Sequence, residues 1–210
     1  MAKLKTATRT IHNAGRLKVV GQFHSYKNGV SVSWESQVER DLLYCLEFAQ
    51  DVASYVPQPE TFEFWLDGKK CRYTPDVRVT QTDGEIRFKE TKAELPNPES
   101  VMALRLNAAQ SAIEGKGYAL DIVCADEIRR GHFVTNIRLL YRYAQWLLPE
   151  EFAEKINRVL PPAGLALGAL VEAVGAEYTG AIYRLMYDQF ISVDMEAAPI
   201  SFGTPVRAKQ

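Results

Sequence analysis

The chain has 210 residues, of which 47% are hydrophobic and 24% charged, and its formal net charge is −1. This composition is typical of globular proteins and excludes a wholly disordered chain, while the length allows one large domain or a main domain with a small appendage. Cys45, Cys71 and Cys124 have neither a disulfide-framework nor a zinc-ligand spacing, which favours a reducing bacterial cytoplasm as the location.

The first segment, residues 1–34, is a basic arm without a single acid. Its cations are Lys3, Lys5, Arg9, Arg16, Lys18 and Lys27. Such an arm suits the phosphates of DNA, and a solvated tail explains it equally well. No apolar run follows the first cations, so we expect no signal peptide. The longest apolar stretch, near 165–174, is too short and too glycine-broken to span a membrane.

Residues 21–33 read as turns with a short strand, and a helix is predicted from about Trp34 to Ala49. Steps of about 100° per residue place an apolar face on this helix. Glu35 lies within that face and Glu39 borders it, whereas Arg40, Asp41 and Glu47 are expected to face solvent. Two acids on the core side therefore need an explanation. One alternative is structural, because Ser36-x-x-Glu39 fits a capping box, although Ser33 is an equally good cap.

The next predicted elements are strands. Residues 51–59 read as a connection that ends in prolines, and 60–66 alternates with Phe62, Phe64 and Leu66 on one face. Asp67-Gly68 is a strong hairpin turn into a returning strand, 69–80. Pro75 within that strand implies an edge position or a bulge just before Asp76.

A second turn leads into strand 85–92, whose apolar face ends in Glu90 and Lys92. A helix over 99–114, closed by glycines, and a buried strand over 118–125 follow it. A strand, a helix and a strand in this order predict a crossover that leaves the two strands parallel in one sheet. Asp126 then caps a short helix, and a further helix covers 137–148.

The chain changes character after residue 148, where it becomes acidic and rich in alanine. Helices are predicted near 150–159, 165–174 and 179–190, followed by a strand pair at 191–195 and 200–206. Three helices and a hairpin indicate a small winged-helix-like α+β domain over 149–210.

One constellation carries chemistry. The period of two puts Glu90 and Lys92 on one face of their strand, and Asp76 can reach the same point across the hairpin, with Glu39 arriving from the helix. Hard carboxylate oxygens suit Mg²⁺, with Mn²⁺ as a substitute, and such an ion activates water and polarises a phosphate. An aspartate followed by Glu-x-Lys is a recurrent arrangement in magnesium-dependent nucleases. Lys92 paired with Glu90 or Glu94 on a wet surface is the bland alternative.

The ordered segments WESQVERDLLYCLEFAQDV, VPQPETFEF, YTPDVRV and FKETK resemble the TnsA endonuclease subunit of heteromeric DNA transposons. The likeness covers residues 21–125. It implies an α/β restriction-endonuclease-like mixed sheet flanked by helices over 35–148, with Glu39, Asp76, Glu90 and Lys92 as the catalytic residues. The metal ligands it implies are Glu39, Asp76, Glu90 and the backbone carbonyl of Thr91. Glu35 has no certain counterpart and is a secondary candidate.

The resemblance further implies a function: cleavage of the 5′ strands at the ends of a transposon, on double-stranded DNA. The partners would be a TnsB-type transposase and a TnsC-type ATPase, with the C-terminal domain used for partner contacts. Two alternatives remain, a stand-alone restriction or repair nuclease and a non-catalytic DNA-binding adaptor with the same fold.

Overall fold

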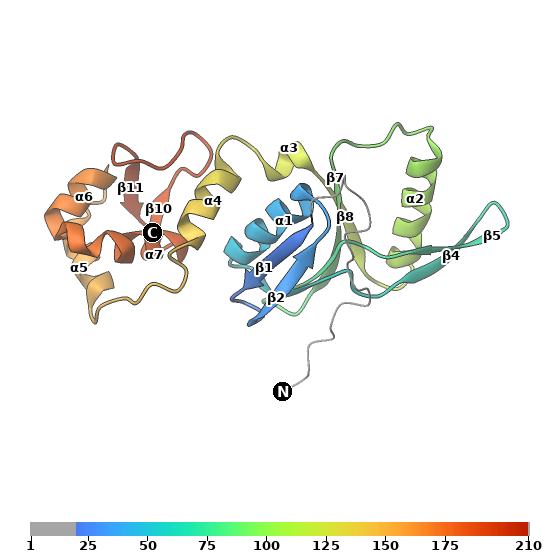
Figure 1. The fold of residues 1–210 in the computed structure, drawn as a ribbon, viewed down its shortest axis with the longest axis horizontal. Coiled ribbons are helices and arrows are strands. Elements are labelled where there is room, and N and C mark those ends of the chain that lie inside the picture. Colours follow the sequence, from blue (N-terminus) through green and yellow to red (C-terminus); the bar gives the residue numbers. More distant parts are fainter. Residues whose placement is uncertain (1–19, 210) are drawn as a thin grey trace. The chain divides into compact units, whose positions relative to one another are not determined.

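The computed structural model of the chain describes residues 20–209. Lys3, Lys5, Arg9, Arg16 and Lys18 of the predicted basic arm therefore lie outside the described residues. Internal contacts divide the chain into two compact units, unit 1 (Met1–Ile128) and unit 2 (Arg129–Gln210), and each is described by itself (Figure 1). The boundary predicted at 148/149 falls inside unit 2, because the helix that precedes it packs there, against α7.

Unit 1 is built on a four-stranded mixed sheet in the order β3-β6-β7-β8. Its strands are β3 (Val52–Pro57), β6 (Val77–Gln81), β7 (Ile86–Lys92) and β8 (Ala119–Cys124). The first three pair antiparallel, and β8 runs parallel to β7, with Glu90 opposite Ile122. The predicted crossover is therefore confirmed.

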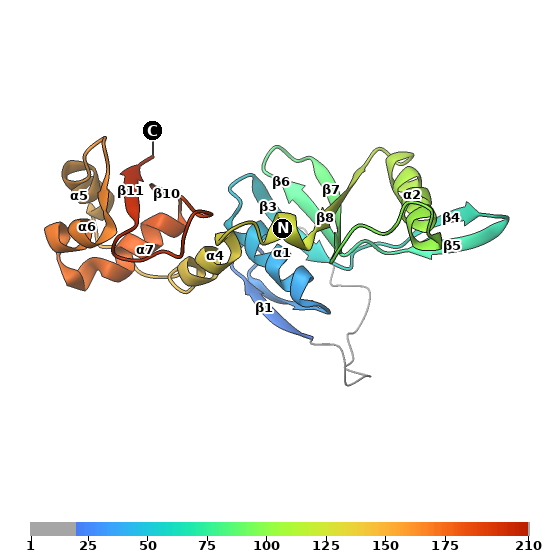
Figure 2. The same cartoon turned by 90° about the horizontal axis from the view of Figure 1, so that it is seen from above.

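Two helices flank this sheet from opposite sides, α1 (Gln37–Phe48) and α2 (Val101–Glu114) (Figures 1 and 2). α2 begins at its cap Ser100, whose hydroxyl accepts the Ala103 N–H at 3.1 Å. It buries Leu106 and Ile113 against Phe88 of β7 and Leu120 of β8. The short helix α3 (Ala125–Ile128) follows β8 directly. The molecule is thus a mixed α/β protein with a helix-flanked sheet.

The strand predicted over 69–80 is wrong as a single element. It is divided into β5 (Lys69–Tyr73), which pairs only with β4 (Phe62–Leu66) in a separate hairpin, and β6 in the main sheet. The break lies at Thr74 to Asp76, where Pro75 has no N–H to donate to a ladder. Asp76 consequently stands just before β6 rather than within a strand.

The connection predicted over 51–59 is also wrong, since most of it forms β3, an edge strand of the main sheet. The strand ends at Pro57, and Gln58 then adopts a left-handed backbone with φ of 42°. The Gln58 N–H donates to the Asp76 carbonyl at 2.7 Å, so this unusual residue is attached directly to Asp76.

The expectation that Asp41 and Glu47 face solvent is wrong, because both are buried, each with 3% exposure. A hairpin of β1 (Gly21–Ser25) and β2 (Val30–Trp34) contacts α1 as a further layer. Glu47 accepts hydrogen bonds from the Ser25 hydroxyl at 2.8 Å and the Tyr55 hydroxyl at 2.6 Å. It also accepts the Lys27 N–H at 2.9 Å.

Lys27, the last cation of the predicted DNA-binding arm, has an internal contact instead of an exposed one. Its ammonium donates to the Val52 carbonyl at 2.6 Å and to the Ala49 carbonyl. Burial lowers the pKa of Lys27, while Glu47 and Asp51 oppose that shift. These bonds fasten the β1–β2 turn to the segment that follows α1, and a DNA contact by Lys27 stays a prediction.

Unit 2 contains four α-helices and a three-stranded sheet within its described residues. The helices are α4 (Phe133–Tyr141), α5 (Phe152–Val159), α6 (Leu167–Val174) and α7 (Thr179–Tyr187), with the 3-10 turn η1 (Ala176–Tyr178) before α7. The strands are β9 (Leu165–Ala166), β10 (Ile191–Val193) and β11 (Pro205–Ala208), and β11 lies between the other two.

The predicted elements of unit 2 are confirmed in type, with α4 beginning at Phe133 and ending at Tyr141 rather than covering 137–148. Buried Asn136 organises the loop between β10 and β11: its amide donates to the Met195 and Ala198 carbonyls and accepts the Ile200 N–H. Among the described helices of both units, none has the length and apolar character needed to cross a membrane.

Candidate functional site

Asp76 is held by hydrogen bonds from two residues of unit 1, Gln58 and Thr91. Its backbone carbonyl accepts the Gln58 N–H, as described above. Its carboxylate oxygen Oδ2 accepts the Thr91 N–H at 2.7 Å and the Thr91 hydroxyl at 2.6 Å. Thr91 therefore orients the carboxylate that precedes β6 from the adjacent strand β7. This contact places Thr91 at the site, and a ligand role for its carbonyl stays a prediction.

Glu90 and Lys92 lie side by side near the end of β7, as their period of two predicts. The Lys92 ammonium donates to Oε1 of Glu90. Glu90 is only 6% exposed, and its other oxygen, Oε2, is buried without a hydrogen-bond partner. The buried Tyr73 hydroxyl lies beside Glu90, and hydrogen bonding from it lowers the pKa of Glu90, although the two atoms do not form a hydrogen bond of regular geometry. A buried carboxylate oxygen without a partner is costly unless a ligand completes it.

Glu39 arrives from the first turn of α1. The cap of that helix is Ser36, not Ser33, and its hydroxyl accepts the Glu39 N–H at 3.1 Å. The Glu39 carboxylate reaches back to the Glu35 N–H at 2.9 Å, one residue before the cap. The capping box predicted for Ser36 and Glu39 is thus present, except that the Glu39 carboxylate binds the N–H of Glu35 instead of that of Ser36. It leaves the carboxylate close enough to feel the charge of Asp76.

Burial shifts all three carboxylates in the same direction. The pKa of Glu39 is raised to about 7, mainly by burial and also by the charges of Asp76 and Glu35, against the opposing hydrogen bonds from Glu35 and Ser36. Burial likewise raises the pKa of Asp76 against the stabilising bonds from Thr91, and the pKa of Glu90 with a contribution from Asp76. Acids that raise one another's pKa in a partly dry site are typical of functional clusters.

A cleft of about 500 Å³ lies beside Glu39 and Asp76. It is lined by Glu35, Glu39, Gln58, Thr61, Arg72, Thr74 and Asp76. Glu35 accepts a hydrogen bond from the Gln58 side chain at 2.8 Å, which places this secondary candidate in the same cleft. Glu90 and Lys92 do not line it. The predicted residues thus form two groups: Glu35, Glu39 and Asp76 line the cleft, and Glu90 and Lys92 do not, while the charge of Asp76 acts on both Glu39 and Glu90.

Several residues of the site escaped the sequence reading. Gln58, Thr61, Arg72 and Thr74 line the cleft, and the Thr61 and Thr74 hydroxyls share a hydrogen bond of 2.7 Å. Tyr73 stands behind them beside Glu90. Thr74 and Tyr73 directly precede Pro75, so the break in the predicted strand was the available signal. Gln58 and Thr61 carried none, because the fold alone brings that segment to Asp76.

The side chains around Asp76 are of the chemical kind that hard divalent cations prefer. They offer the carboxylates of Glu39, Asp76 and Glu90, with one buried oxygen unsatisfied and a single ammonium in direct contact. Hard oxygen ligands of this kind match Mg²⁺ or Mn²⁺. An added positive charge would also relieve the repulsion that raises the pKa values of the three acids.

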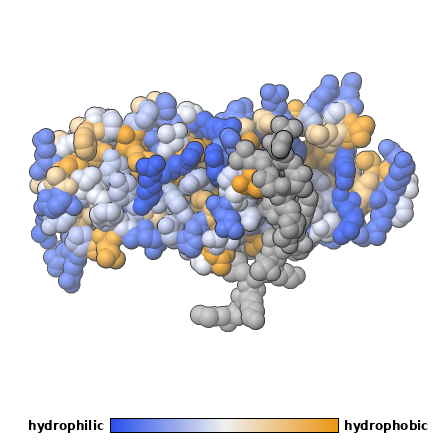
Figure 3. All heavy atoms as spheres, viewed as in Figure 1, coloured by the Kyte–Doolittle hydropathy of each residue, from blue (hydrophilic) through white to orange (hydrophobic). Residues whose placement is uncertain are grey.

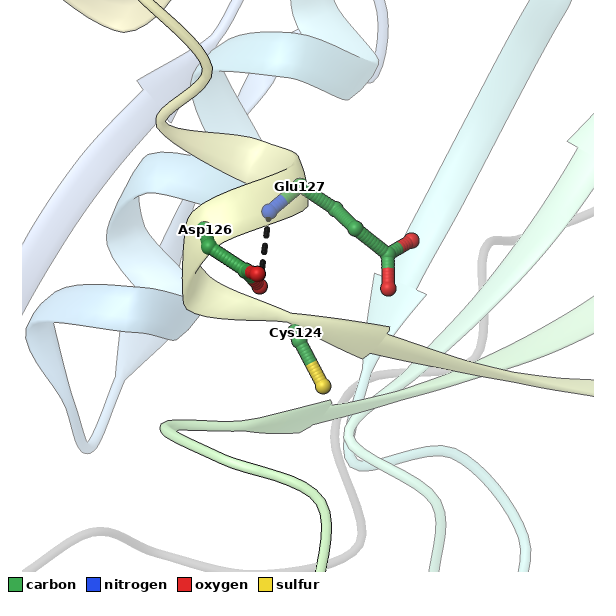
Figure 4. Close-up of side chains that lie close together, drawn as sticks. All are labelled: Cys124, Asp126 and Glu127. Carbon is green, nitrogen blue, oxygen red and sulfur yellow. Dashed lines mark hydrogen bonds between the residues drawn. The ribbon is translucent and has the colours of Figure 1, made fainter.

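Within residues 20–209, the three carboxylates of Glu39, Asp76 and Glu90 do not all lie within 4.8 Å of one another. The group of side chains whose ligand atoms do is Cys124, Asp126 and Glu127, at the junction of β8 and α3 (Figure 4). Asp126 accepts the Glu127 N–H at 3.0 Å, so it is engaged in its own turn. Both acids are exposed and the thiol is buried. This group therefore gives no independent indication of a metal.

A scan of the chain against protein-family models gives no match, and a search of curated proteins gives none. The site must accordingly be interpreted from its own geometry and chemistry.

Proposed function

We propose that this chain is a metal-dependent DNA endonuclease that hydrolyses phosphodiester bonds. The observation that carries the proposal is that Glu39 and Glu90, from two other elements, both lie in the electrostatic field of Asp76, with Lys92 hydrogen-bonded to Glu90. Partly buried acids close to one another destabilise the folded protein unless positive charge balances them. Because Lys92 is the cation hydrogen-bonded to these acids, a bound metal ion is a reasonable source of the remaining positive charge.

Each residue then has a part. Glu39, Asp76 and Glu90 would hold Mg²⁺, which supplies activation of a water and polarisation of the phosphate when it is bound. Thr91 fixes the rotation of the Asp76 carboxylate. Lys92 supplies positive charge beside the reacting phosphate, because its ammonium already lies against Glu90. Glu35, held by Gln58, adds negative charge that strengthens attraction of a cation to the cleft.

The more specific proposal is a TnsA-type subunit with a restriction-endonuclease-like core. The mixed β3-β6-β7-β8 sheet between helices, with the acids at β6 and β7, supports this core. In unit 2 the order α5-β9-α6-α7-β10-β11, with β11 central, supports the winged-helix interpretation. Such a subunit would cut the 5′ strands at transposon ends together with a TnsB-type transposase and a TnsC-type ATPase.

The decisive experiment is Mg²⁺-dependent cleavage of transposon-end DNA by the wild type and by Asp76→Ala, with the partner proteins present. We expect the rate to fall by at least about a hundredfold, the order seen when one electrostatic group is removed from a reacting centre. Asp83→Ala is the matched control, because Asp83 is an exposed aspartate in the turn of the same hairpin, where it bonds only to the Glu85 N–H. If Asp76→Ala cleaves as fast as the control, the site assignment is wrong.

Two further measurements separate the alternatives. Cleavage by the purified chain alone would favour a stand-alone restriction or repair nuclease. Titration calorimetry with Mn²⁺ tests the adaptor alternative, since a non-catalytic chain without a metal site would show no binding at millimolar metal. We expect binding in the wild type and its loss in Asp76→Ala.

A further inference from the structure

The β4–β5 hairpin stands apart from the main sheet and has two chemically different faces. Both views show it running past α2 and projecting beyond it (Figures 1 and 2). Its inner face buries Phe62 and Phe64, and Phe62 packs in the core with Leu106 and Ile113 of α2. The outer face is exposed, and its four residues form two cross-strand pairs: Glu63 opposite Arg72, and Trp65 opposite Lys70.

The outer face combines an exposed tryptophan with positively charged side chains, which is unusual for a surface that binds nothing. Trp65 is 70% exposed, although tryptophan is costly to leave in water, and it stands beside Lys70. Figure 3 shows this end of unit 1 as mainly hydrophilic atoms with a few apolar ones among them. Lys70 and Arg72 share one acid, Glu63, at 2.7 Å and 3.9 Å. The face therefore carries a net positive charge.

The ion pairs of Lys70 and Arg72 with Glu63 are weak and leave both cations accessible to another anion. The side chains of Lys70 and Arg72 are 56% and 72% exposed, and exposed pairs contribute little free energy. A phosphate can therefore compete with Glu63 for either cation. The strand beneath is fixed, because the Arg105 guanidinium of α2 donates to the Arg72 carbonyl at 2.9 Å.

Arg72 links this face to the candidate site, because it also lines the cleft with Glu39 and Asp76. A cleft lined by acids repels a polyanion unless a cation offsets their charge, and Arg72 is the cation among the lining residues. From Arg72 to Lys69 at the tip, β5 advances by three residues, about 10 Å, the rise of about three base pairs of B-DNA. The face thus has the length and charge to follow one strand of a duplex away from the cleft.

We propose that the outer face of the β4–β5 hairpin is a DNA-binding arm, on which Lys70 and Arg72 contact phosphates beside the scissile one and Trp65 packs against the sugar-phosphate backbone. This inference rests on the proposed nuclease function in one respect: that function places the scissile phosphate of the bound DNA at the cleft. The binding itself rests on charge complementarity and on the continuity of the face with the cleft. Double-stranded DNA is the occupant.

The test is binding of a fluorescein-labelled DNA duplex to the full chain by fluorescence anisotropy, in EDTA so that no cleavage occurs. The variant is Lys70→Ala with Arg72→Ala, and the matched control is Lys69→Ala. Lys69 is the adjacent exposed lysine, of equal charge, and strand alternation puts it on the other face. Circular dichroism establishes that the variants are folded.

We expect the double variant to bind several-fold more weakly, and the slope of log affinity against log salt to fall by about 2, since each phosphate contact contributes about 0.9. Lys69→Ala should keep the wild-type slope. DNA should also change the tryptophan emission of the wild type, and Trp65→Phe should abolish that change. Equal affinity and slope in the wild type and the double variant would overturn the arm, as would equal losses in Lys69→Ala.

The outcomes for the arm and for the nuclease are distinguishable. If the wild type and the double variant cleave DNA equally well with Mg²⁺ and bind it equally, the arm is wrong and the nuclease stands. If the double variant loses affinity but no chain cleaves DNA under any metal condition, the arm stands and the nuclease is wrong. Retained affinity for an acidic protein partner, without affinity for the duplex, also overturns the arm.

Discussion

The two ends of α1 each carry a glutamate that points into unit 1, and the two sites are opposite in design. Glu47, near the end of the helix, accepts hydrogen bonds from Ser25, Tyr55 and the Lys27 N–H. Glu39, in the first turn, accepts the Glu35 N–H and otherwise lies in the field of other acids. The Glu47 carboxylate is surrounded by hydrogen-bond donors, whereas the Glu39 carboxylate lies near other carboxylates.

Under the proposed function, this difference separates a structural carboxylate, Glu47, from a functional one, Glu39. A buried charge that is surrounded by donors stabilises the native packing and needs nothing more. A partly buried charge beside like charges costs stability in the folded protein, and a bound cation or substrate can offset that cost. Helix α1 is thus anchored near its C-terminal end by the hydrogen bonds of Glu47 and places Glu39 in the cleft at its N-terminal end.

The largest expected effect is on catalysis, from Glu39→Gln. The amide keeps the shape of the side chain and its bond to the Glu35 N–H but removes the negative charge. We expect Mg²⁺-dependent cleavage to fall by about a hundredfold to a thousandfold. The free energy of unfolding, from urea titration at neutral pH, should not fall. Wild-type cleavage by this variant would reduce Glu39 to its capping contact.

Glu47→Ala should have the opposite pattern. Three donors lose a charged acceptor in a buried place, so we expect the free energy of unfolding to fall by about 3 kcal/mol. Urea unfolding followed by circular dichroism measures this change. Mn²⁺ affinity of the folded fraction should stay at the wild-type value, because Glu47 is at the other end of the helix. Lost stability together with lost metal affinity would show that the two ends are not independent.

Ser36→Ala tests the cap that both roles of Glu39 share. It removes the hydroxyl that accepts the Glu39 N–H, and loss of such a cap costs about 1 kcal/mol. The cleavage rate should fall much less than in Glu39→Gln, since the carboxylate remains. The matched control is Ser33→Ala, the alternative cap, which should leave stability nearly unchanged because Ser33 does not cap the helix.

The smallest expected effect is on pH dependence in the metal-free protein. The pKa of Glu39 is raised by burial to about 7 from its ordinary value of 4.5. Between these two values the folded state keeps a proton that the unfolded state has lost. The stability contribution of the protonated form is therefore complete below pH 4.5 and is lost as pH rises through 7.

The measurement compares the wild type with Glu39→Gln, so that other titrating groups largely cancel. From about pH 5 to about pH 8 the wild type should lose more free energy of unfolding than the variant. The difference should stay below about 1 kcal/mol, because solvent reaches Glu39 and screens its charge. Parallel profiles for the two proteins would contradict the raised pKa.

Much of the site's framework was readable in the sequence. The turn before Glu85 and the helix that ends in glycine predicted the β6–β7 hairpin and its parallel neighbour β8, because both depend on local signals. The meeting of Asp76 with Glu90 followed from the period of two in β7. The cap could not be chosen from the sequence, since Ser33 and Ser36 are chemically equal; in the structure Ser33 lies within β2 and Ser36 caps the helix.

Two errors share one physical origin, which is the use of local pattern where tertiary layers decide. Helical periodicity assigned one buried face to α1, so Asp41 and Glu47 were expected in water, but the β1–β2 hairpin contacts the helix as an added layer. The prolines at 57 and 59 outweighed the apolar residues of β3, although an edge strand tolerates a proline at its end.

The two bonds from Thr91 to Asp76 have a consequence for spectroscopy. Both donors go to Oδ2, so the two oxygens of this carboxylate are chemically inequivalent before anything binds. A carboxylate locked in this way is a one-sided ligand, and its antisymmetric and symmetric infrared stretches should be widely separated. Isotope-edited difference spectra against Thr91→Val would single out this group among the acids of the chain and report directly on what its remaining oxygen touches.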